Sequence, residues 1–121
     1  MLNKKMKRIF MVFLGSIMFC ITTFANNVEI QHLLSFVKNT PCTYIRNGSE
    51  HTGEEAVKHI QRKYDYFKDE IQTTVDFIRL SATQSTISGK AYEVICDGQT
   101  QASAQWLLNE LARFRSQSAI H

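Results

Sequence analysis

Six side chains that could perform acid–base, ligand-binding or metal chemistry gather around one short stretch of the sequence. They are Arg46, Glu50, His51, Glu55, His59 and Lys63. The first three surround a predicted turn, and the last three follow at steps of four residues, a spacing that lines side chains along one face of a helix. This grouping is the candidate functional site of the chain.

The chemistry of this group leaves several functions open. Two histidines and two carboxylates are ligands for a divalent metal or an acid–base pair, and Arg46 with Lys63 would suit an anionic ligand. The alternative is structural, with Glu55 used in helix capping and His59 flanked by solvated partners. The spacing differs from the zinc motif of two histidines four residues apart on a helix, so neither a metal nor another cofactor is predicted.

Nucleophilic catalysis has little support in the sequence. The serines considered as nucleophiles, none of which lies in a glycine-flanked nucleophile elbow, are Ser49, Ser85, Ser88 and Ser103. Their surroundings favour turn and cap positions, and the chain is interpreted, on balance, as lacking an enzymatic activity.

The elements around the site follow from capping and turn signals. The run Thr52-Gly53-Glu54-Glu55 is a capping box, which predicts a helix beginning there, and Thr73 with Asp76 predicts a second, shorter one. A strand over residues 43–46 ends at Asn47-Gly48, and another over residues 91–96 ends at Asp97-Gly98.

Apolar periodicity adds a helix at each end of this region, over residues 28–39 and from Ser103 onward. The predicted fold class is therefore α+β, with three to four helices packed on one face of a small antiparallel sheet. The expected order of elements is helix, strand, helix, helix, strand, helix.

The first 25 residues have the pattern of a secretory signal peptide. Four basic residues precede an apolar run over residues 9–24, and Thr23-Phe24-Ala25 places small residues where a signal peptidase reads them. Cleavage is expected after Ala25, which leaves residues 26–121 as a single small domain. The alternative is a retained membrane anchor, but a spanning helix needs about 20 apolar residues, and this run is shorter and contains Gly15 and Ser16.

The net positive charge of the chain comes from this leader. The sequence has 14 Lys and Arg against 11 Asp and Glu, for a formal charge of +3. All four basic residues of the leader leave with it, so the remaining domain is close to neutral. Its charge gives no support to binding of nucleic acid, and no membrane span is expected after cleavage.

Two cysteines, Cys42 and Cys96, remain after cleavage and would reside in an oxidising compartment. Both flank strand-like segments, so a disulfide joining two strands distant in sequence is predicted. Two buried free thiols are the alternative.

The chain resembles a known family through several motifs: Tyr44-Ile45-Arg46-Asn47-Gly48, Glu50-His51-Thr52, Glu55-Ala56, His59, Lys63, Phe77-Ile78, Ser88-Gly89, Tyr92 and Trp106-Leu107. Together they are similar to the YfeK-like small exported proteins of Gram-negative bacteria, over about residues 28–115. The resemblance implies a periplasmic location. It implies no activity or cofactor, because the family is a domain of unknown function.

Two functional hypotheses follow. The first is a non-catalytic interaction or envelope-associated module, whose partner would be an envelope protein. The second is a binder of a small anionic ligand, or a hydrolase, that uses Arg46, His51, His59 and Lys63.

Overall fold

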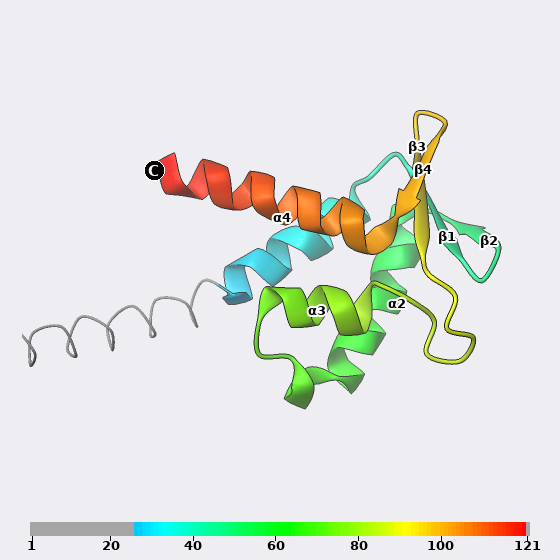
Figure 1. Ribbon diagram of the computed structural model, residues 1–121, viewed down its shortest axis with the longest axis horizontal. Helices are drawn as coiled ribbons and strands as arrows, with labels where there is room; N and C mark the ends of the chain where they lie inside the picture. Colours follow the sequence, from blue (N-terminus) through cyan, green and yellow to red (C-terminus); the bar gives the residue numbers. More distant parts are fainter. Residues whose placement is uncertain (1–25, 121) are drawn as a thin grey trace, which may run out of the picture.

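The computed structural model describes residues 26–120 and consists of four helices and one sheet (Figure 1). The predicted leader over residues 1–25, with its cleavage after Ala25, lies outside the described residues. None of the helices within residues 26–120 combines the length and apolarity that crossing a membrane requires.

The sheet consists of two β-hairpins. Its strands are β1 (Thr43–Arg46), β2 (Ser49–His51), β3 (Glu93–Cys96) and β4 (Gln99–Ala102), in the order β2-β1-β3-β4 with every neighbouring pair antiparallel. Both hairpin turns are the predicted ones. Asn47 and Gly48 have φ values of 53° and 79°, and Asp97 and Gly98 have 51° and 76°, as a two-residue turn with positive φ at both positions requires.

The predicted α+β class and antiparallel sheet are confirmed, but each strand expected from the sequence is the first strand of a hairpin. The additional strands β2 and β4 have the sequences Ser-Glu-His and Gln-Thr-Gln-Ala and lie at the two edges of the sheet. Backbone pairing forms an edge strand without requiring a buried apolar side chain at alternate positions, so hydrophobic alternation does not reveal it.

The helices are an N-terminal helix over residues 26–38, α2 (Gly53–Tyr66), α3 (Thr74–Ser81) and α4 (Ser103–Ile120), with a short 3-10 turn at Lys68–Glu70. Both predicted capping boxes are present. Glu55 N donates to Thr52 Oγ1 at 3.2 Å and Thr52 N donates to Glu55 Oε1 at 3.0 Å, and Thr73 with Asp76 repeats the arrangement at the start of α3.

All four helices lie on one side of the sheet (Figure 1). The core lies between them and the sheet face that carries Tyr44 and Val94, which are 1% and 0% exposed. Ile45 and Ile95 alternate with these residues and are only partly buried on the other face. On the inner face Tyr44 Oη and Ser103 Oγ share a buried hydrogen bond of 2.8 Å, which joins β1 to the first residue of α4.

The predicted disulfide between Cys42 and Cys96 is confirmed. It extends the antiparallel ladder of β1 and β3 by one step beyond the Thr43–Ile95 pair, with the two Cα atoms 4.7 Å apart. The bond therefore ties together the two central strands, which are separated by 54 positions in the sequence.

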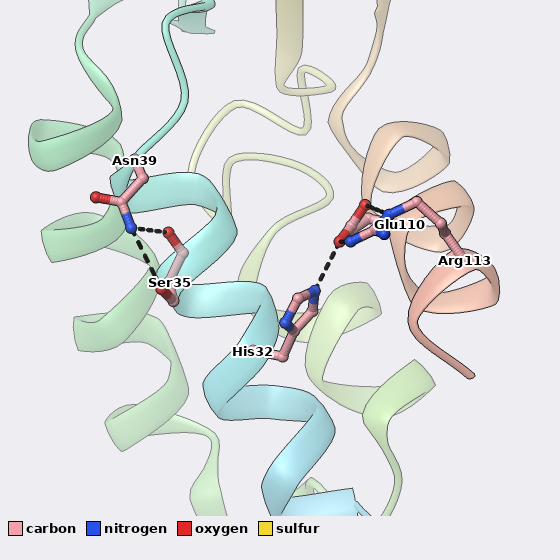
Figure 2. A network of polar contacts seen from close by, with 5 residues as sticks. All are labelled: His32, Ser35, Asn39, Glu110 and Arg113. Carbon is pink, nitrogen blue, oxygen red and sulfur yellow. Dashed lines mark hydrogen bonds and ion pairs between the residues drawn. The ribbon is translucent and has the colours of Figure 1, made fainter. Parts of the chain in front are cut away.

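Two buried carboxylates join the N-terminal helix to α4. Glu110 accepts hydrogen bonds from Arg113 Nε at 2.8 Å and Arg113 Nη2 at 2.6 Å, and it contacts His32 Nε2 at 2.6 Å (Figure 2). Glu29 likewise accepts hydrogen bonds from both Nε and Nη2 of Arg115. These arginines lower the pKa of both carboxyl groups, so both carboxylates are charged and paired at neutral pH.

Candidate functional site

The six residues predicted to form one site fall into two separate groups. His59 and Lys63 bond to the hydroxyl of Tyr92, Arg46 bonds to His59, and we call these four residues the Tyr92 cluster. Glu50, His51 and Glu55 instead line a cavity of about 380 Å³ beside Cys42 and the start of α2.

The Tyr92 cluster forms where α2 crosses the inner face of the sheet. His59 and Lys63 lie one helical turn apart on α2. Arg46 is two positions after the buried Tyr44 on β1, and Tyr92 is two positions before the buried Val94 of β3. Side chains two positions apart on a strand point to the same face, so both strands direct their members of the cluster toward α2.

The hydrogen bonds of the cluster determine the tautomer of His59. Arg46 Nη1 lies 3.0 Å from His59 Nδ1, and because a guanidinium only donates, Nδ1 is the acceptor and carries no proton. In the neutral ring the proton is then on Nε2, which donates to Tyr92 Oη at 2.9 Å. Both ring nitrogens of His59 are therefore engaged inside the protein.

Lys63 is held as firmly as His59. Its Nζ donates to the Gln84 carbonyl oxygen at 2.6 Å and to Tyr92 Oη at 3.3 Å, and it lies 5.0 Å from the centroid of the Tyr92 ring. The last distance is within the range of a cation–π interaction. The ammonium group thus has a fixed position between the cluster and the loop that contains Gln84.

Within residues 26–120, no ion pair joins a carboxylate to Arg46 or to Lys63. Burial and the charges of Arg46 and Lys63 lower the pKa of His59 to about 4. Burial and Arg46 also lower the pKa of Lys63, and burial raises the pKa of Tyr92. The cluster is therefore a partly buried concentration of positive charge around a neutral histidine.

The titration of His59 gives a first prediction. Its folded pKa of about 4 lies below the ordinary value of 6.5, so between these pH values the unfolded chain binds a proton that the folded chain does not. When the pH is lowered from 6.5 to 4, the free energy of unfolding of the wild type should therefore fall by about 1–2 kcal/mol more than that of His59→Gln. This value allows for the partial exposure of the His59 side chain to solvent. Urea denaturation at several pH values measures the difference, and parallel pH profiles would contradict it.

The second group, which consists of Glu50, His51 and Glu55, contains both carboxylates of the predicted site. Glu55 is already bound to the backbone of Thr52 in the capping box, and this contact lowers its pKa. Glu50 lies on the sheet face without helices, because it pairs with Ile45 in the register of β1 and β2. Across the described part of the chain, no three His, Cys, Asp or Glu side chains are grouped so as to hold a metal ion.

Two members of the site escaped the sequence prediction. Tyr92 and Gln84 are 33 and 21 positions from the α2 residues that they bind. The alternation of Tyr92 with Val94 on a predicted strand was the available signal, because it assigns the tyrosine to the face that the helices cover. The contact of the Gln84 carbonyl has no signal in the sequence, since it depends on the path of a loop.

Comparison with known proteins found a family of unknown function and an uncharacterized relative. A family described as "Family of unknown function (DUF5329)" matches residues 24–115. The chain is also 42% identical over 50 residues to the uncharacterized protein YfeK of Salmonella typhimurium, an alignment that spans 41% of this chain and 42% of that protein. No solved structure matches the chain.

Proposed function

The chain belongs to the DUF5329 family of unknown function, and we propose that it is an exported protein of the Gram-negative periplasm that acts by binding and not by catalysis. The engagement of His59 within the Tyr92 cluster carries this proposal. His59 has both ring nitrogens in hydrogen bonds and Glu55 is bound in a helix cap. A general base needs a free nitrogen or oxygen within reach of its substrate, and neither ring nitrogen of His59 is free.

Three of the four serine hydroxyl groups considered as nucleophiles, those of Ser85, Ser88 and Ser103, are engaged in a similar way. Ser103 bonds Tyr44 in the core, Ser88 donates to Asn47 Oδ1 at 2.7 Å, and Ser85 accepts from the amides of its own loop. These contacts stabilise the loop and the core. They leave binding as the function that the geometry supports best, with an envelope protein or a small ligand as the partner.

The disulfide and the amino-terminal pattern support export. A disulfide persists in oxidising compartments such as the periplasm, and Cys42–Cys96 joins the two central strands. We expect the protein to be recovered from the periplasmic fraction with Asn26 as its first residue and no free thiol. Intact-mass analysis under non-reducing conditions measures both features, and a full-length chain in the membrane fraction would contradict them.

A test of catalysis uses the protein recovered from that fraction. Panels of chromogenic esters, phosphates and glycosides should give no turnover above a matched preparation of His59→Ala. Turnover that is present in the wild type and lost in His59→Ala would overturn the proposal of binding without catalysis.

A second candidate function, binding of a small anion, is favoured by the charge of the Tyr92 cluster. Arg46 and Lys63 are fixed near one another without a carboxylate in the described residues to neutralise them. Bringing two cations together and partly desolvating them is unfavourable, and an anion from solution would relieve the cost. His51 lies in the separate cavity beside Cys42, so this candidate rests on Arg46 and Lys63.

A further inference from the structure

We infer that a cavity between α2, α3 and the loop over residues 83–90 binds an organic anion, with the charged group at Lys63 and an apolar portion against Phe67 and Leu80. This inference rests on the proposed anion-binding function and adds the class of ligand. The cavity has a volume of about 370 Å³, which is within the range of small-molecule sites.

The cavity has an apolar wall and a polar wall. Phe67 and Leu80 are only partly buried by the rest of the protein and supply the apolar wall. Thr83, Ser85 and Thr86 line it from the loop and bring hydroxyl groups. A site with an apolar wall and a few polar groups favours a ligand that has both characters.

Two cations border the cavity. Lys63 is fixed by Gln84 and Tyr92, as described above, and it is the residue that the cavity shares with the Tyr92 cluster. Arg79 contacts Asp76 through Nη2 at 3.3 Å, and its side chain remains 61% exposed. Such an exposed pair contributes little to stability, so the guanidinium can turn to an anion at small cost.

The loop wall is formed before any ligand binds. Ser85 is 5% exposed, and its Oγ accepts from the amides of Ile87 at 3.3 Å and Ser88 at 3.2 Å. Ser88 Oγ in turn donates to Asn47 Oδ1 at 2.7 Å, which fixes the loop to the turn between β1 and β2. A preformed wall lowers the entropy cost of ordering on binding.

The test compares anions of equal charge that differ in apolar length: methyl phosphate with butyl phosphate, and acetate with pentanoate. The protein purified from cells that export it is titrated with each anion by NMR, which gives affinities and locates the perturbed residues. The longer member of at least one pair should bind at least about tenfold more tightly, because each buried methylene contributes roughly a fourfold gain and burial of two of the three added methylenes is enough for this difference. The shifts should centre on Lys63, Leu80 and the 83–90 loop.

Variants separate the two parts of the site. Lys63→Gln should weaken every anion that binds by about tenfold, as expected for loss of a charge-assisted hydrogen bond. Leu80→Gln should abolish the gain from chain length and leave methyl phosphate unchanged. Lys58→Gln, which removes an exposed lysine from the same helix, is the matched control and should change neither.

Two negative results of this experiment would have different consequences. If all the anions bind at Lys63 with affinities independent of chain length, the proposal of an organic ligand is wrong and the proposal of anion binding stands. If none of them shifts the resonances of Lys63 or Arg46, or if Lys58→Gln weakens binding as much as Lys63→Gln, both are overturned.

Discussion

Replacing Cys42 and Cys96 together with alanine should lower the free energy of unfolding by about 4 kcal/mol, the value that chain-entropy estimates give for a loop of this length. The bond closes a loop of 54 positions and joins β1 to β3, which form the centre of the sheet. A domain of this size has a small core and a correspondingly small margin of stability. Urea denaturation measures the loss.

The wild type in the presence of reductant is the control for this prediction. Reduction breaks the bond without removing the sulfur atoms, so its urea midpoint should fall nearly as far as that of the double alanine variant. A loss below about 1 kcal/mol in both samples would show that the unfolded chain gains little freedom, contrary to the entropic explanation.

Arg115→Leu should lower the free energy of unfolding by about 2–3 kcal/mol, less than the 3–5 kcal/mol of a fully buried pair because Arg115 is partly exposed. The Glu29 side chain is 9% exposed, and Arg115 donates to it from Nε at 2.6 Å and from Nη2 at 3.0 Å. Thr74 Oγ1 remains as a donor at 2.6 Å. One hydroxyl does not compensate the charge of a buried carboxylate.

The pH dependence of this loss distinguishes lost charge pairing from lost packing. In the wild type Arg115 lowers the pKa of Glu29, so the contribution of the pair is present above the unfolded pKa and disappears as the pH falls through the folded pKa. The deficit of Arg115→Leu should therefore shrink as the pH falls below the ordinary glutamate value of 4.5, and Glu29→Gln with Arg115→Leu should recover part of it. A deficit independent of pH would contradict the assigned role of the charge.

Local signals in the sequence predicted most of the fold. Thr52 with Glu55 marked the start of α2, and both two-residue turns lie where Asn47-Gly48 and Asp97-Gly98 placed them. Such signals succeed because the cap or turn residue itself makes the required contact or adopts the required φ. The edge strands β2 and β4 were missed because their polar side chains have no alternation that reports on backbone pairing.

The candidate site was predicted less completely than the fold. His59 and Lys63 were correctly grouped by their spacing of four residues, and Arg46 joins them because β1 directs it toward α2. Glu55 has the same spacing from His59, yet its carboxylate turns back to Thr52. Prediction from proximity along the chain therefore assigned too many residues to one site. The crossing of α2 over the sheet determines which side chains lie near Tyr92.

We propose that His59 is a fixed, neutral member of a cationic binding site and not an acid–base catalyst. NMR of the imidazole nitrogens across a pH titration tests it directly. At neutral pH we expect Nδ1 without a proton and Nε2 with one, and a titration midpoint near the pKa of about 4, well below the 6.5 of an ordinary histidine. A midpoint at or above pH 6.5, with Nδ1 protonated, would contradict the assignment.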